Sequence, residues 1–152
     1  MKLKLVKVGP IKSKEIESLC SDFIKRLRPY IKVETLTLKD SDGAKGERNG
    51  SILETLGQDG SHKVFLLDER GQKYSSEKFA AFYKKLKDNP SVKTVSLVVG
   101  GAFGFTEEMR KGADGLISFS DMVFPNEIAW LILTEQTYRG FSILAGSSYH
   151  HT

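Results

Sequence analysis

The amino-acid sequence predicts an α/β domain in which a mostly parallel sheet is flanked by helices. Some segments alternate polar with apolar residues or are continuously apolar, and both patterns are typical of strands. They are separated by segments with apolar residues every three or four positions, which is typical of helices. Two of the strand segments, 64–67 and 94–99, are almost continuously apolar, which is typical of strands buried on both faces of a sheet. The 152 residues fit a single domain, 1–152, with no internal repeat and no linker that would divide it.

The first three predicted elements alternate between strand and helix. Lys2–Val8 alternates lysine with Leu and Val and is predicted to be a strand. Residues 13–28 carry apolar side chains at helical spacing, with Ser13 as the candidate N-cap and Pro29 as the stop signal. Residues 31–38 alternate again and predict a second strand.

The middle of the chain begins with a polar, glycine-rich segment, 39–50, which predicts a loop. A short helix is expected at 51–56. The apolar run 64–67 predicts a buried strand, 75–87 a helix capped by serine, and 94–99 a further buried strand.

The last third of the chain contains three more predicted elements. A short helix begins at Thr106, with glutamates in its first turn, where the helix dipole favours negative charge. Residues 116–119 predict a short strand and 126–144 the last helix.

Three loops leave predicted strand ends, where parallel α/β sheets bind their ligands. They are LLDERG (66–71), VVGGAFGF (98–105) and SFSDMVFP (118–125). The glycines of the second loop allow backbone to approach a ligand closely, but the loop has neither P-loop nor dinucleotide-fingerprint spacing. Asp68 and Glu69 could act as an acid–base pair, although their charged surroundings favour a solvated turn.

The last helix and the tail after it carry further candidate functional residues. Glu135 and Arg139 are four residues apart and so lie on one helix face. The pair is either a stabilising surface pair or an arginine held ready for a phosphate. The chain ends on Tyr149-His150-His151-Thr152, a short tail that could be a frayed terminus, a tag remnant or part of a site.

Charge and cysteine content limit the classes of partner and compartment. Residues 1–32 hold nine Lys and Arg against three Asp and Glu, so the net charge of this segment is +6. The rest of the chain has a net charge of −2, which gives +4 in total. Such a face suits a polyanion such as RNA, or is a solvated lysine face. The single cysteine, Cys20, lies in a helical pattern and predicts a buried thiol in a reducing compartment.

Neither a membrane nor a metal is expected as a partner of this chain. No run approaches the ~20 apolar residues of a membrane span, and no apolar signal region opens the sequence, so a soluble cytoplasmic protein is predicted. No His, Cys, Asp or Glu cluster has the spacing of a metal site.

Taken together, the three loops, the segment EQTYR and the terminal YH resemble the ribosomal RNA large subunit methyltransferase H family, small members of the SPOUT class. The resemblance runs from the opening MKLKLVKVGPIK to the tail. It implies a C-terminal trefoil knot over approximately 64–152, a homodimer, and S-adenosylmethionine bound in the knot. It also implies methylation of N3 of a pseudouridine in 23S rRNA of the assembled ribosome.

The same resemblance assigns site residues. Its cofactor-binding positions fall on the three loops, at Leu67, Gly100, Gly101, Gly104, Phe119, Ser120, Asp121, Met122, Val123 and Phe124. Its catalytic positions are Tyr149 and His150, expected to fold back beside the cofactor's methyl, and Arg139, expected to hold the RNA backbone. A histidine or a carboxylate could take the N3 proton.

The sequence departs from the family pattern at three positions. Asn126 stands where the family usually has His, Trp130 where it has Arg, and Ser148 where it often has Pro. Trp130 could stack on a base or pack in a dimer interface, and its apolar helix favours packing. An RNA- or ribosome-binding SPOUT protein with altered or lost activity is therefore the alternative function, and a nucleotide-binding α/β protein of another kind is a third.

Overall fold

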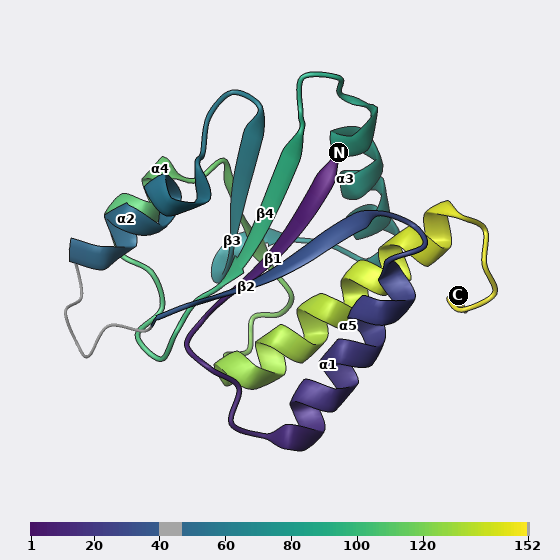
Figure 1. Ribbon diagram of the computed structural model, residues 1–152, viewed down its shortest axis with the longest axis horizontal. Helices are drawn as coiled ribbons and strands as arrows, with labels where there is room; N and C mark the ends of the chain where they lie inside the picture. Colours follow the sequence, from purple (N-terminus) through teal and green to yellow (C-terminus); the bar gives the residue numbers. More distant parts are fainter. Residues whose placement is uncertain (40–46, 152) are drawn as a thin grey trace.

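The computed structural model describes residues 1–39 and 47–151, with side chains from residue 52 onward in the second range. It contains a five-stranded sheet in the order β2-β1-β4-β3-β5, and every neighbouring pair of strands is parallel (Figure 1). The elements in chain order are β1 (Lys2–Val8), α1 (Lys14–Leu27), β2 (Lys32–Leu38), α2 (Glu47–Leu56), β3 (His62–Lys73), α3 (Ser76–Asp88), β4 (Thr94–Val99), α4 (Glu107–Gly112), β5 (Gly115–Ser118) and α5 (Asn126–Leu144). The predicted α/β class is confirmed.

Helices cover both faces of the sheet (Figure 1). One face packs against α1, α3 and α5, and the other against α2 and α4. The strand β1 shows how the sequence builds both cores, because Leu3 and Leu5 face the first layer whereas Val6 and Val8 face the second. The continuously apolar β4 is likewise buried on both faces, as its composition predicts.

Most predicted boundaries agree with the structure to within one or two residues. The bounds of β1, β4 and α5 are those predicted. The predicted cap of α1 is also confirmed, since the Ser13 hydroxyl accepts a hydrogen bond from the Ile16 backbone N–H at 3.2 Å.

Two predictions along the chain need correction. The helix expected at 51–56 begins at Glu47, so the end of the predicted loop 39–50 is helical, while 40–46 lie outside the described residues. The expected loop 66–71 belongs to β3, which continues to Lys73.

An irregularity in β3 explains the second correction. Leu67 and Gln72 both pair with Ile117 of β5, so the residues between them bulge out of the ladder. Gly71 ends this bulge directly against β5: a Cβ there would lie 2.5 Å from the Ile117 backbone nitrogen. Glycine is therefore required by the close approach of two backbones, and not by a surface turn.

The knot over approximately 64–152 and the single-domain boundary 1–152 stay predictions. Among the helices in the described part of the chain, none is both long enough and apolar enough to cross a membrane.

A buried histidine, His62, is the first residue of β3. The His62 ring nitrogen Nε2 is 2.8 Å from the Ser96 hydroxyl. Burial lowers the pKa of His62 below its usual 6.5, and the charge of Lys4 acts in the same direction, whereas Asp59 and Asp114 oppose them.

This histidine predicts acid sensitivity. Below pH about 6.5 the unfolded chain protonates the imidazole while the folded chain resists, so the free energy of unfolding should fall as pH drops from 6.5 through the lowered pKa. The His62→Gln variant should lose this part of the pH dependence in urea titrations at pH 7.5 and 5. The exposed His151→Gln is the matched control and should keep it. Equal slopes for the wild type and His62→Gln would contradict the prediction.

Candidate functional site

A pocket lies at the carboxyl ends of β3 and β5, where the first and third loops meet. Its cavity volume is only about 90 Å³, whereas the cavity that adjoins it measures about 560 Å³, within the ~300–1,000 Å³ typical of small-molecule sites. Its walls are mainly apolar side chains and backbone from β3, β5, the loop after β5 and α5: Leu67, Asp68, Glu69, Ile117, Ser118, Phe119, Ser120, Met122, Val123, Phe124 and Ala129.

A second cavity adjoins the first across shared walls. It adds the end of β4, the glycine-rich loop 100–105 and Arg110, and shares Leu67, Phe124 and Ala129 with the first cavity. The carboxyl ends of β4, β3 and β5, adjacent in the sheet, therefore border two adjoining cavities, which are called the cleft.

The structure brings nearly all predicted cofactor residues to this cleft. Leu67, Phe119, Ser120, Met122, Val123 and Phe124 line the first cavity, and Gly100, Gly101 and Gly104 line the second. Asp121 lines neither cavity and instead forms an ion pair with Lys73.

Local sequence shapes the two loops of the cleft. Gly104 has φ +65°, a conformation that favours glycine. A Cβ on Gly100 would come within 3.1 Å of the Phe105 ring, so a side chain there would compete with the cleft's own wall. In the other loop, the Met122 backbone N–H donates to the Ser120 hydroxyl at 2.9 Å, which fixes a tight turn at the pocket rim.

Asp68 is not the solvated turn residue that the sequence favours. It is 7% exposed and its Oδ2 accepts from Nε of Arg110 at 2.7 Å, while its Oδ1 accepts from the Arg70 backbone N–H at 3.0 Å. A carboxylate held by a guanidinium is a structural support rather than a free acid or base. Its partner Arg110 lies on α4, 42 residues later in the chain. No pattern in the sequence around Asp68 indicates this pairing.

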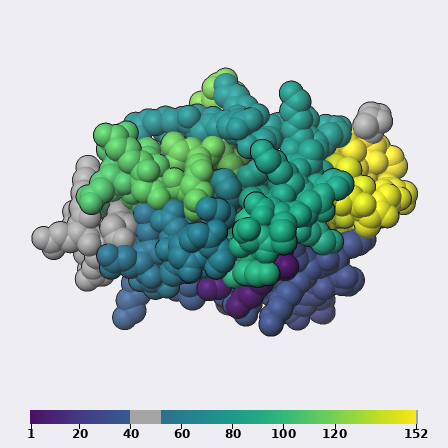
Figure 2. Space-filling model, turned by 90° about the horizontal axis from the view of Figure 1, so that it is seen from above, coloured from purple at the N-terminus to yellow at the C-terminus, as the bar shows by residue number. Residues whose placement is uncertain are grey.

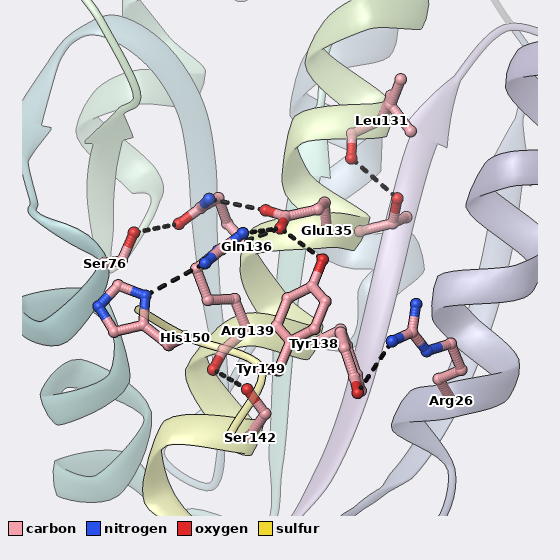
Figure 3. A network of polar contacts seen from close by, with 11 residues as sticks. Arg26, Ser76, Leu131, Glu135, Gln136, Tyr138, Arg139, Ser142, Tyr149 and His150 are labelled. Carbon is pink, nitrogen blue, oxygen red and sulfur yellow. Dashed lines mark hydrogen bonds and ion pairs between the residues drawn. The ribbon is translucent and has the colours of Figure 1, made fainter. Parts of the chain in front are cut away.

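A second cluster of polar side chains joins the tail to α5 and α3 (Figure 3). Oε1 of Glu135 accepts from Nη2 and Nε of Arg139 at 2.6 and 3.0 Å, and from the Tyr149 hydroxyl at 3.0 Å. His150 contacts Arg139 through Nδ1, at 3.1 Å from Nη1, and Glu77 through Nε2, at 2.8 Å from Oε1. The predicted catalytic residues Arg139, Tyr149 and His150 are therefore in one network.

Aromatic contacts hold the tail as well. The Tyr149 ring packs edge-on against Tyr138 at 4.7 Å between centroids, with the guanidinium carbons of Arg26 and Arg139 5.1 and 4.8 Å from its centroid. Burial, followed by the hydrogen bond to Glu135, raises the pKa of Tyr149, so its hydroxyl stays protonated at neutral pH. In Figure 2 the yellow C-terminal part of the chain is in contact with the teal and blue segments beside it. Tyr149 and His150 are thus held against the rest of the chain and are not a frayed end.

The tail cluster and the cleft are separate within one chain. Ala129, on the first turn of α5, lines the cleft, and Arg139 follows ten residues later, about 15 Å along the axis at 1.5 Å per residue. The tail folds back, as expected, but onto α5 and α3 and not onto the cofactor loops. None of Arg139, Tyr149 and His150 lines either cavity.

Two of the three positions where the chain departs from the family pattern have different environments. Asn126 lines the second cavity and its side-chain oxygen accepts from the Glu127 N–H at 3.1 Å. Trp130 is 2% exposed and packs in the core with Nζ of Lys7 5.2 Å from its ring. Trp130 is therefore part of the core of its own chain, and not of the dimer interface that its apolar helix favours; burial also leaves its ring without a face for a base.

Among residues 1–39 and 47–151, no group of three or more His, Cys, Asp or Glu side chains is arranged to hold a metal ion.

Known proteins resemble this chain in sequence and in fold over nearly its whole length. A family model described as "Predicted SPOUT methyltransferase" matches residues 1–150. Proteins named ribosomal RNA large subunit methyltransferase H are similar to this chain, in Christiangramia forsetii at 38% identity and in Mycoplasmopsis pulmonis at 39%. Each match covers 99% of this chain and 99% of the relative. A crystal structure of a probable methyltransferase from Bordetella pertussis Tohama I shares the fold. Its TM-score is 0.59 at 9% identity, over 92% of this chain and 94% of that one.

Proposed function

The chain belongs to the ribosomal RNA large subunit methyltransferase H family of SPOUT methyltransferases, and we propose that it methylates N3 of a pseudouridine in 23S rRNA with S-adenosylmethionine as methyl donor. The observation that carries the proposal is the cleft, in which three loops far apart in sequence meet at adjacent strand ends.

The residues of the cleft fit the proposed cofactor. An adenine ring needs an apolar slot with backbone donors and acceptors at its edges. Leu67, Phe119 and Phe124 supply apolar walls, and the backbone of loops 100–104 and 119–123 supplies polar edges. The cofactor, when bound, supplies a methyl group on a sulfonium that a nucleophilic nitrogen can take.

The reaction also requires a proton acceptor. The N3–H bond of the pseudouridine breaks as the N3–CH₃ bond forms, and the departing proton must reach a base. Tyr149 is unsuited because its hydroxyl stays protonated and donates to Glu135. His150 is the member of the tail cluster whose ring offers a nitrogen that can act as a proton acceptor.

Since the cleft and the tail cluster are apart in one chain, both can act on one nucleotide only if a second subunit contributes its tail. Reacting groups must lie within ~3–3.5 Å of each other, far less than the separation along α5. The proposed homodimer meets this need. Its support is the apolar rim of the cleft, where Met122 and Val123 are 73% and 80% exposed and suit contact with another surface.

The proposed RNA partner is supported by charge. The first 32 residues carry +6, and the last turn of α1 brings Arg26 next to the tail cluster, where its guanidinium packs on Tyr149. If these basic side chains bind RNA phosphates, the affinity for RNA should fall as the salt concentration rises.

Calorimetry and a methylation assay test the proposed function. The protein should bind S-adenosylmethionine saturably and transfer methyl to ribosomes that carry the pseudouridine, but not to ribosomes that lack it. Absence of cofactor binding would remove the methyltransferase proposal. Cofactor and ribosome binding without methyl transfer would support the alternative, an RNA- or ribosome-binding protein that has lost activity, for which Asn126 in the cleft wall is the specific observation.

A further inference from the structure

The two ring nitrogens of His150 face partners of opposite character. Arg139 can only donate hydrogen bonds, because a guanidinium has no acceptor. Its Nη1 lies 3.1 Å from Nδ1, so Nδ1 must be the unprotonated nitrogen. The Glu77 carboxylate can only accept, and it lies 2.8 Å from Nε2, so Nε2 must carry the proton. The imidazole is therefore neutral and in the Nε2–H tautomer.

From this arrangement we propose that Glu77 is a positioning residue for His150: it fixes the tautomer whose Nδ1 accepts the N3 proton, while Arg139 covers Nδ1 until RNA draws the guanidinium away. The inference rests on the proposed function. It assigns a role to a residue of α3 that neither the motifs nor the cleft point to.

Glu77 is anchored well enough for this role. It lies in the first turn of α3, two residues after the N-cap Ser75, whose hydroxyl accepts from the Lys78 N–H at 3.2 Å. Its neighbour Ser76 is hydrogen-bonded to Gln136 of α5 at 2.8 Å, and Gln136 donates to Glu135 at 2.7 Å. This chain of hydrogen bonds fixes the first turn of α3 against the helix that carries Arg139.

The charge and burial of the pair fit a carboxylate that orients an imidazole. Hydrogen bonds from its own backbone N–H and from His150 hold the pKa of Glu77 at about 2, so it is ionised at every physiological pH. The His150 side chain is only 15% exposed, whereas that of Glu77 is 52% exposed. The imidazole is thus held in place while its partner remains in contact with solvent.

The proton and charge balance explains why Arg139 must move. When N3 loses its proton, a new Nδ1–H bond forms and His150 becomes an imidazolium, while the sulfonium of the donor becomes a neutral thioether. Glu77 stabilises the imidazolium, but Arg139 at 3.1 Å would repel it. An RNA phosphate is the group that can compete for a guanidinium now shared with Glu135. Binding of RNA would then uncover the base where it is needed.

Nitrogen NMR of ¹⁵N-histidine-labelled protein tests the tautomer without any assay of activity. The free protein should show His150 as Nε2–H. In Arg139→Met, where Glu77 alone remains, the same tautomer should persist. In Arg139→Met/Glu77→Ala the two tautomers should mix. An unchanged single tautomer in the double variant would overturn the role of Glu77, even if the wild-type protein methylates ribosomes normally.

Kinetics provides the second test. Glu77→Ala should lower kcat roughly 10- to 100-fold, the usual effect of losing an orienting partner, with KM for ribosomes within about twofold. Glu77→Asp should recover part of kcat, and Glu77→Gln should shift the acidic limb of the kcat profile to lower pH. The control Glu54→Gln removes a carboxylate from an exposed position on α2 and should match the wild type.

These outcomes separate the two proposals. A wild-type kcat and pH profile in Glu77→Ala would refute the positioning role and leave the methyltransferase proposal intact. A wild-type protein that never methylates ribosomes would refute the proposed function, whatever the tautomer.

Discussion

Two variants that are each inactive are expected to restore about a quarter of wild-type methyl transfer when their subunits are mixed. The variants are Gly100→Val, which damages the cleft, and His150→Ala, which removes the proposed base. Random pairing makes about half of the dimers mixed, and each mixed dimer regains one of its two sites, as two-fold symmetry requires. The measurement is transfer of radiolabelled methyl to ribosomes after co-expression with two different tags.

The physical reason is the distance between the cleft and the tail in one chain. Ala129 lines the cleft and Arg139 holds His150, and the two helix positions are ten residues apart, about 15 Å along the axis. In a mixed dimer the intact cleft of the His150→Ala subunit meets the intact tail of the Gly100→Val subunit. The other site combines both defects and stays inactive.

The controls use the same variants. A chain carrying both substitutions, mixed with itself, should remain inactive, and circular dichroism should show that Gly100→Val is folded although its new side chain crowds Phe105. Activity at background level in verified mixed dimers would exclude a site shared between subunits. Undiminished activity of His150→Ala alone would remove that residue from the reaction.

Predictions from sequence succeeded where the determining pattern is local. Lys2–Val8 and Thr94–Val99 have the predicted bounds, because alternation and continuous apolar character depend only on neighbours in the chain. The Ser13 cap succeeded for the same reason, since its acceptor and the Ile16 N–H are three residues apart.

Predictions from sequence failed where a distant partner decides. The charged neighbours of Asp68 predict a solvated turn, yet Arg110, 42 residues later, pairs with it at the wall of the cleft. The resemblance located the cofactor loops, and it named Tyr149 and His150. It could not show that the tail docks on α3, because the docking partner Glu77 belongs to no recognised motif.

The contact of β3 with β5 predicts the largest loss of stability from a single methyl group. In Gly71→Ala the new Cβ would press on the Leu116 carbonyl carbon and lie 2.5 Å from the Ile117 backbone nitrogen. Added methylenes cost about 1–3 kcal/mol where side chains can yield. Here the opposing atoms are backbone held in a strand ladder, so the free energy of unfolding should fall by roughly 3 kcal/mol or more.

Urea unfolding of Gly71→Ala, with Gly60→Ala as its matched control, measures the effect. A Cβ added at Gly60 would meet no heavy atom within 4 Å, so this variant should change stability by no more than about 0.5 kcal/mol. Because the bulge that Gly71 ends also carries Asp68 and Glu69 into the cleft wall, the affinity for S-adenosylmethionine should fall with stability. Equal stability of the two variants would mean that β5 does not pass so close to β3. Lost stability with unchanged affinity would mean that the bulge does not shape the cofactor site.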